Sequence, residues 1–184
     1  MKSLSVLCAA AVAGAVLTAA ASAMAQTPPP PCKPAKLPPI SNTRPAGEPS
    51  PEATINLVEG QNFLAENAKK PGVKSLPSGA QYKVLASGAK DAACANPELR
   101  LRLHYEGRLI DGTVFDSSLD GAPAVFSLGG LIQGWQQVVP YMRIGDEWEI
   151  YLPAKLGYGE RGSGSDVPPN SVLIFKLKLL GMLG

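Results

Sequence analysis

The chain has 184 residues, with 17 basic Lys and Arg side chains against 15 acidic Asp and Glu side chains. Because the basic and acidic side chains are nearly equal in number, the composition argues against a strongly basic protein that binds nucleic acids or acidic membranes. We therefore expect no nucleic-acid partner and turn to the elements in chain order.

The first 25 residues have the organisation of a secretory signal peptide. Lys2 supplies a positive charge, the run "LSVLCAAAVAGAVLTAA" is apolar, and "AMA" ends at Ala25 with the small residues of a cleavage site. The apolar run is short for a membrane-spanning helix, and no charged stop follows it. We expect cleavage of residues 1–25, a location in the periplasm or outside the cell, and no stable membrane insertion afterwards.

Two segments precede the predicted globular domain. Residues 26–51 are rich in proline and poor in large apolar side chains, which predicts an extended tether. Residues 52–75 predict a short helical lead-in, because Ile55, Val58 and Phe63 fall loosely at helical spacing and Pro51 precedes them. Gly60 weakens the middle of that helix.

Residues 76–184 have the pattern of strands broken by Gly, Pro, Asp and Asn. Six segments alternate or run apolar: "AQYKVLAS", "ELRLRLHYEGRLI", "TVF", "AVFSL", "EWEIYLPA" and "SVLIFKLKLL". "GWQQVVPYM" indicates one short helix that is cut near Pro140. The sequence predicts an α+β domain with an antiparallel sheet of five to six strands and one buried short helix.

The stretch "LHYEGRLIDGTVFDSS" concentrates polar groups and raises the hypothesis of acid/base catalysis. A hydrolase of the glycosidase type would take its carboxylate pair from Asp111, Asp116 and Glu106, with His104 as a base. Strand alternation argues against this, because it places Tyr105 on the apolar face and His104 on the opposite one. Asp111 and Gly112 are typical of a hairpin turn.

No other catalytic or metal-binding motif stands out. The serines lack a G-x-S-x-G context, no H-E-x-x-H occurs, and "GYGERGSGSD" lacks the Lys-Ser/Thr pair of a phosphate loop. We expect neither a metal nor a cofactor. Aromatic residues recur instead along the domain: Tyr105, Phe115, Phe126, Trp135, Tyr158 and Phe175. We interpret Phe126 as plain core, whereas Trp135 follows a glycine at a helix start and would form the floor of a pocket.

Four motifs resemble the FKBP family of peptidyl-prolyl cis-trans isomerases: "LHYEGRLIDGTVFDSS", "GGLIQGW", "LGYGERGSGSDVPPNSVLIF" and the closing "KLKLL". They occur in the family's order over about residues 76–184. The preceding "EGQNFLAENAKKPGVKSLPSGAQYKVL" is similar to the lead-in of the exported, Mip-like bacterial group. The resemblance implies a twisted antiparallel sheet wrapped around one short helix.

The resemblance also implies an activity and a site. The activity is isomerisation of X-Pro bonds in extracytoplasmic clients. The implied catalytic residues are Tyr105, Phe115, Asp116 and Tyr158, and the implied substrate-binding residues are Leu131, Ile132, Trp135, Val167 and Phe175. The implied partners are proline-containing polypeptides and macrolide inhibitors such as rapamycin. The alternative is an FKBP-fold chaperone or peptide-binding module without catalysis.

The sequence departs from the family pattern at the rim of the implied pocket. "SSLDGAPAVF" lacks the Arg that often pairs with the pocket Asp. Ala124 stands where some members carry an aromatic residue, and Asp166 replaces a second aliphatic residue before Val167. These changes predict a more open and more acidic rim.

Two cysteines remain after signal cleavage, Cys32 on the tether and Cys94 in "DAACANP". Export to an oxidising compartment favours a bond between them. Two free thiols, or a bond from Cys32 to a second chain, are the alternatives. Because only a short helix precedes the domain, whereas longer Mip-like relatives dimerise through an extended helical region, we expect a monomer.

Overall fold

The structure is a computed structural model that describes residues 31–34, 37–39 and 49–184. The predicted signal peptide, residues 1–25, lies outside these residues, as does most of the predicted proline-rich tether. The account below concerns the described part of the chain.

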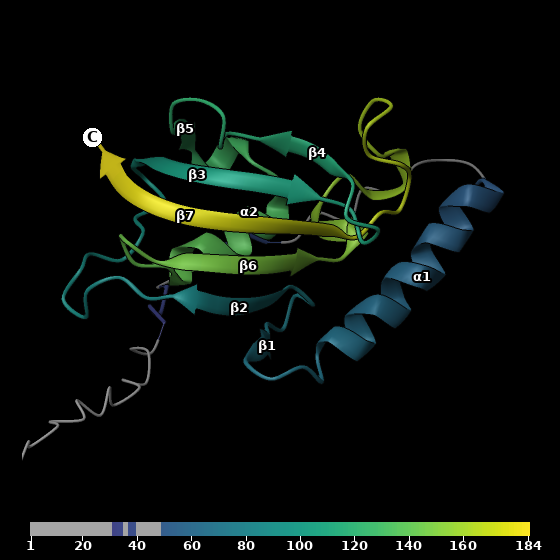
Figure 1. The fold of residues 1–184 in the computed structure, drawn as a ribbon, viewed down its shortest axis with the longest axis horizontal. Helices are drawn as coiled ribbons and strands as arrows, with labels where there is room; N and C mark the ends of the chain where they lie inside the picture. Colours follow the sequence, from purple (N-terminus) through teal and green to yellow (C-terminus); the bar gives the residue numbers. More distant parts are fainter. Residues whose placement is uncertain (1–30, 35–36, 40–48) are drawn as a thin grey trace, which may run out of the picture.

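An antiparallel sheet of seven strands forms the centre of the molecule (Figure 1). Its order is β1-β2-β6-β7-β3-β4, and β5 also pairs with β3. The strands are β1 (Val73–Ser75), β2 (Gln81–Ala86), β3 (Arg100–Arg108), β4 (Val114–Ser117), β5 (Ala124–Ser127), β6 (Glu147–Leu152) and β7 (Leu173–Leu183). The predicted mixture of antiparallel sheet and helix is therefore confirmed.

The sheet has one strand more than the five to six predicted. The additional strand is β1, which pairs with β2 from Val73↔Lys83 to Ser75↔Gln81. Its three residues contain one apolar side chain, too few to show an alternating pattern. Pairing with β2 makes it a strand.

The core lies between the sheet and a short helix, α2 (Gln133–Val138), which Figure 1 shows behind the strands. Alternation of apolar and polar residues produces this arrangement, because Leu101 and Leu103 of β3 are buried while Arg100 and Arg102 are exposed. The chain after α2 continues as a turn of 3-10 helix, Val139–Tyr141, where Pro140 precludes a regular α-helix.

Helix α1 (Pro51–Asn67) stands beside the sheet and confirms the predicted lead-in helix. The Ser50 side chain accepts a hydrogen bond from the Ala53 N–H at 3.1 Å, and Pro51 occupies the first turn. The apolar residues of the helix do not all face the domain, although the Phe63 ring does pack against Tyr151 of β6 at 6.2 Å. Ile55 and Val58 are 56% and 51% exposed.

Small and polar residues also hold α1 against the domain. A Cβ atom at Gly60 would lie only 2.7 Å from Cγ2 of Val172, so glycine permits the close approach there. The Asn170 side chain donates to the Ala53 carbonyl at 2.9 Å, and the buried Asn67 donates to the Gln81 side chain at 2.9 Å. The glycine that weakens the helix thus also permits its close packing on Val172.

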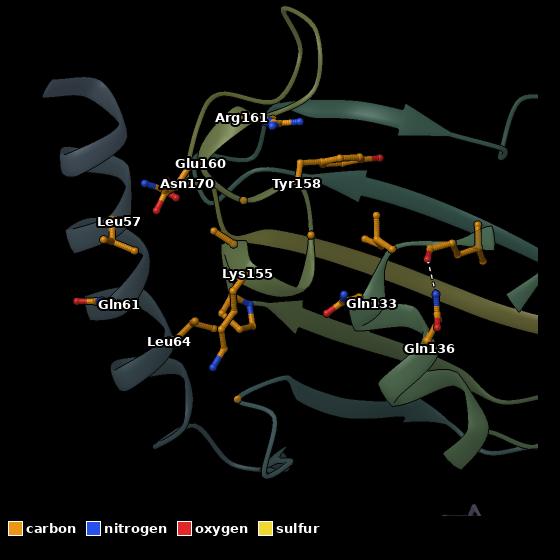
Figure 2. Close-up of a pocket in the computed structure, with 17 residues that line it drawn as sticks. Leu57, Gln61, Leu64, Gln133, Gln136, Lys155, Tyr158, Glu160, Arg161 and Asn170 are labelled. Carbon is orange, nitrogen blue, oxygen red and sulfur yellow. Dashed lines mark hydrogen bonds between the residues drawn. The ribbon is translucent and has the colours of Figure 1, made fainter. Parts of the chain in front are cut away.

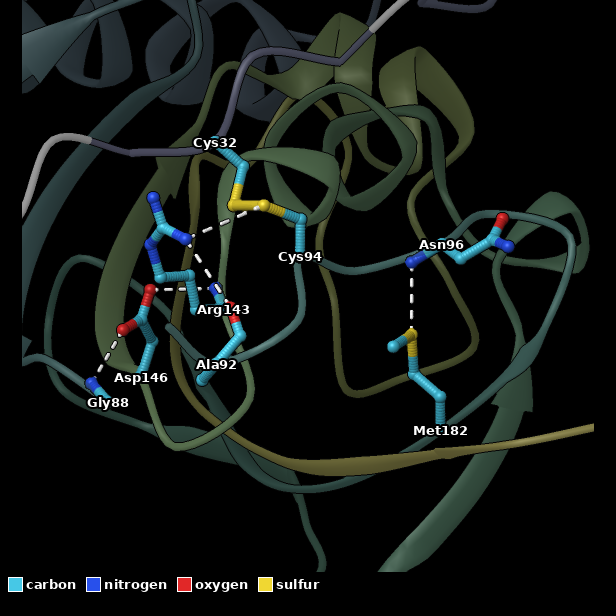
Figure 3. Close-up of a disulfide and its surroundings, with 8 residues drawn as sticks. All are labelled: Cys32, Gly88, Ala92, Cys94, Asn96, Arg143, Asp146 and Met182. Atoms are coloured by element: carbon cyan, nitrogen blue, oxygen red, sulfur yellow. Dashed lines mark hydrogen bonds between the residues drawn. A yellow bond between two sulfur atoms is a disulfide. The ribbon is translucent and has the colours of Figure 1, made fainter. Parts of the chain in front are cut away.

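Cys32 and Cys94 form a disulfide, which confirms the intramolecular pairing over the two alternatives (Figure 3). Cys32 is buried, and its N–H donates to the Tyr141 carbonyl at 2.8 Å. The Gln137 side chain of α2 donates to the Pro38 carbonyl at 2.7 Å. The described part of the proline-rich segment is therefore bound along α2 and the turn that follows it.

Candidate functional site

Strand β3 separates the two titratable side chains that the sequence places next to each other. His104 points to the polar side, where its Nδ1 lies 3.1 Å from the Ser118 hydroxyl. Tyr105 points to the other side, where its ring packs against Trp135. As predicted from strand alternation, His104 does not face the aromatic residues.

Trp135 is the centre of an aromatic cluster. Its ring is almost fully buried and meets Tyr105, Phe126 and Phe175 at centroid distances of 5.6, 6.2 and 5.2 Å. All three rings stand within about 11° of perpendicular to the indole plane. The three rings therefore surround the indole, which forms the base of the cluster.

Phe115 and Asp116 are consecutive in β4, yet both approach this cluster. The Phe115 ring packs edge-on against Phe175 at 5.6 Å, and Asp116 accepts a hydrogen bond from Tyr105. A regular strand would send two consecutive side chains to opposite faces. The pairing of β3 with β4 shifts register between Gly107 and Arg108, and this bulge turns both side chains toward the cluster.

Gly107 makes room for the two phenylalanine rings. A Cβ atom at this position would lie 2.7 Å from Cζ of Phe115 and 2.7 Å from Cε1 of Phe175. Any larger residue would push the rings apart. Gly107 is a site residue that the sequence analysis missed.

Tyr105, Asp116 and Tyr158 form the polar part of the site. The Tyr105 hydroxyl donates to Oδ2 of Asp116 at 2.7 Å. Burial is the main cause that raises the pKa of Tyr105, and the hydrogen bond to Asp116 raises it further. Burial, followed by the charge of Asp116, also raises the pKa of Tyr158. Both phenols therefore keep their protons at neutral pH and remain hydrogen-bond donors.

The start of α2 places two further candidates beside Trp135. Leu131 and Ile132 are half-buried against the core, and Ile132 is the N-cap residue of the helix. Among the described residues, no acceptor is found for the Ile132 N–H. The Gln136 side chain donates to the Leu131 carbonyl at 2.7 Å and so fixes the turn before the helix.

Val167 belongs to the same buried core and lies on the chain segment between Tyr158 and β7. The described structure thus brings eight of the nine candidates into direct packing or hydrogen-bond contact with the core or with one another. The ninth, Tyr158, is 39% exposed, and the charge of Asp116 contributes to its raised pKa. Asp111, by contrast, is in the exposed turn, where its carboxylate accepts from the Thr113 N–H at 2.9 Å.

A hollow of about 1100 Å³ adjoins the aromatic cluster (Figure 2). It shares Leu131, Ile132 and Tyr158 with the candidate site and extends from there to α1. Within the described ranges, no group of His, Cys, Asp and Glu side chains is placed to hold a metal ion. No helix of the described residues is long and apolar enough to cross a membrane.

Two family models match the chain. The model described as "FKBP-type peptidyl-prolyl cis-trans isomerase" matches residues 92–180. The model described as "Domain amino terminal to FKBP-type peptidyl-prolyl isomerase" matches residues 39–84. Together they include both the aromatic cluster and the docked helix α1.

Curated relatives from several organisms match the same part of the chain. It is 48% identical over 126 residues to the "FKBP-type 22 kDa peptidyl-prolyl cis-trans isomerase" of Escherichia coli, covering 68% of this chain and 60% of the relative. It is 47% identical over 128 residues to "Peptidyl-prolyl cis-trans isomerase Mip" of Coxiella burnetii, covering 69% and 55%. The chain thus spans little more than half the length of these relatives.

Solved structures agree with the family assignment. A peptidyl-prolyl cis-trans isomerase of Pseudomonas syringae superposes with a TM-score of 0.67 at 30% identity, over 75% of this chain and 100% of that one. FkpA of Escherichia coli superposes with a TM-score of 0.67 at 33% identity, over 71% and 60%. The chain belongs to the FKBP-type peptidyl-prolyl cis-trans isomerase family, and its matches to Mip and FkpA place it among the Mip-like members.

Proposed function

We propose that this protein catalyses cis-trans isomerisation of X-Pro peptide bonds in polypeptide clients. The observation that carries the proposal is the buried Trp135 ring with Tyr105, Phe126 and Phe175 standing around it. In this proposal Trp135 is the floor under the proline ring. The walls are Phe115, Leu131, Ile132, Val167 and Phe175.

The reaction requires rotation about an amide bond and no acid/base step. Amide resonance creates a barrier of about 18 to 20 kcal/mol. A dry aromatic site disfavours the charge-separated resonance form of the amide and so weakens the double-bond character of C–N. An aromatic pocket can therefore act as a catalyst without a titrating group.

Three polar groups complete the proposed mechanism. The Ile132 N–H and the Tyr158 hydroxyl donate to substrate carbonyls, and both lack a partner within the described structure. Asp116, held by the Tyr105 hydroxyl, places negative charge beside the rotating bond. These groups act as catalysts to the extent that they bind the twisted amide more tightly than the planar one.

The direct test is a protease-coupled assay on a short proline-containing peptide, run with and without rapamycin. We expect turnover that the macrolide abolishes, because both ligands would occupy the Trp135 pocket. Tight binding of the macrolide without turnover would show the alternative, a peptide-binding module. A protein that neither turns over the peptide nor binds the macrolide would refute the assignment of the Trp135 pocket.

We further propose that the protein works after export, on clients in the periplasm or outside the cell, and that it is a monomer. The disulfide of Cys32 with Cys94 supports export, since such bonds persist in oxidising compartments. The docking of α1 on its own domain supports the monomer, since this helix is already held by Asn170 and Gln81. N-terminal sequencing of the exported protein and light scattering test these two points.

A further inference from the structure

A groove leads away from the rim of the aromatic cluster. Residues of the proposed isomerase site line only one end of it. Leu131, Ile132 and Tyr158 are at that end, and the groove continues between α1 and the segment 153–161 (Figure 2). Its volume is about 1100 Å³. Pockets that enclose a whole drug-sized ligand measure roughly 300 to 1,000 Å³. The space is therefore larger than one proline residue requires.

Helix α1 forms the far wall of this groove. Figure 2 shows Leu57 and Leu64 directed from α1 toward the segment 153–161, near Lys155. Leu57 is 41% exposed, so an apolar group placed against it would remove its surface from water. Lys155, Glu160 and Arg161 also line the groove and contribute charges of both signs. The lining thus favours a largely uncharged ligand with apolar groups.

The wall is a fixed part of the domain. The Asn56 side chain donates to the Pro169 carbonyl at 2.8 Å, and Asn170 donates to the Ala53 carbonyl at 2.9 Å. Gly60 lies against Val172. These contacts come from the same face of α1 as Leu57 and fix the helix beside the groove, so the groove is preformed.

We propose that this groove binds the stretch of client polypeptide next to the isomerised proline, with an apolar client side chain against Leu57. The inference rests on the proposed function, because it takes the proline to be on Trp135. A chain leaving that position passes the Ile132 N–H and the Tyr158 hydroxyl, which can pair with its backbone carbonyls. Four further residues extend at most about 14 Å, which carries the chain away from the proline pocket along the groove.

The test compares a four-residue peptide, Ala-Leu-Pro-Ala, with versions extended by Leu-Ala-Leu-Ala before or after it. Extension by Gly-Ser-Gly-Ser provides the control for length. Turnover is followed by exchange NMR and binding by fluorescence anisotropy, on the full mature chain. The variant is Leu57→Ser, and its matched control is Val58→Ser, which is on the same helix, is 51% exposed and does not line the groove.

We expect one of the two Leu-Ala extensions to lower KM and Kd about fivefold, which corresponds to about 1 kcal/mol. Leu57→Ser should remove this gain, Val58→Ser should retain it, and kcat/KM for the short peptide should be the same in all three proteins. Equal affinity for short and extended peptides, or a gain that survives Leu57→Ser, would overturn the proposal.

Other outcomes separate this inference from the proposed function. A wild-type protein that does not turn over the short peptide refutes the isomerase, while the anisotropy series still decides whether the groove binds peptide. A change in molar mass caused by Leu57→Ser, without a change in affinity, would assign the groove to a second copy of the chain and reject the client.

Discussion

The Tyr105 hydroxyl and the Asp116 carboxylate are joined by a 2.7 Å hydrogen bond between two neighbouring strands. We expect Tyr105→Phe to lower kcat/KM about fivefold, because a bond of this kind contributes on the order of 1 kcal/mol and here orients the charge beside the rotating amide. Steady-state kinetics on a short proline peptide measure this effect.

Tyr151→Phe is the matched control for Tyr105→Phe. Tyr151 also donates its hydroxyl to a carboxylate, that of Glu149, and its ring packs against Phe63 of α1 rather than against Trp135. This variant should lower the free energy of unfolding and leave kcat/KM unchanged. Equal losses of activity in the two variants would show that Tyr105 acts through stability alone.

Truncation of the Phe115 ring should lower kcat/KM more than removal of the Asp116 carboxylate. We expect Phe115→Ala to lower kcat/KM at least tenfold, and more than Asp116→Ala does, because burial of the proline ring underlies every other contribution. Trp135→Ala should behave likewise. Losing a large buried aromatic side chain costs about 3 to 5 kcal/mol of stability, so circular dichroism must first establish that each variant is folded.

Val114→Ala provides the comparison for Phe115→Ala. Val114 is the neighbouring residue of β4 and is 51% exposed. Its truncation should leave kcat/KM within about twofold of the wild type, since exposed substitutions change little. A folded Trp135→Ala variant with wild-type turnover would reject the assignment of the pocket.

The activity should be nearly independent of pH from about 6 to 8. Burial raises the pKa of Tyr158 above its ordinary value of about 10, so the hydroxyl remains a donor throughout this range. The stability that this raised pKa provides is fully present below about pH 10 and is lost as the pH rises through the folded-state value. A bell-shaped profile of kcat/KM that His104→Gln abolishes would instead indicate acid/base catalysis.

Reduction of the disulfide should destabilise the domain moderately. The two cysteines are 62 residues apart, for which the chain-entropy model gives about 4 kcal/mol. Because the described stretch around Cys32 and Pro38 that is bound to the domain is short, we expect a loss of about 2 kcal/mol in the double variant Cys32→Ser/Cys94→Ser. Urea unfolding measures this loss, and an unchanged midpoint would contradict it.

Patterns that repeat along the chain made much of the fold predictable. Alternation placed Leu101, Leu103 and Tyr105 on the inner face of β3 and His104 on the outer one. Such patterns require several residues, so three-residue β1 escaped detection. Helical spacing predicted that α1 forms but not which of its residues contact the domain: Ile55 is exposed, whereas Phe63 packs on Tyr151.

The site was predicted less completely, because parts of it depend on contacts between distant segments. Phe126 was interpreted as core, yet its ring contacts both Trp135 and Tyr105. Gly107 and the bulge beside it have no local signal, since their purpose appears only when Phe175 from β7 is packed against Phe115. The role of Gln136 likewise becomes visible only in the structure, where its side chain donates to the Gly129 and Leu131 carbonyls.

The last strand of the chain, β7, is central in the sheet, so the sheet cannot be completed before β7 is present. This strand lies between β3 and β6, and its partner β3 comes from far earlier in the chain. Pairings between such distant segments close large loops and belong to the slow class of folding reactions. Phe175 reaches Trp135 and Phe115 only when this closure is complete. A chain that lacks β7 therefore has neither a complete sheet nor the Phe175 ring that packs against Trp135, so the candidate site depends on the last strand to be synthesised.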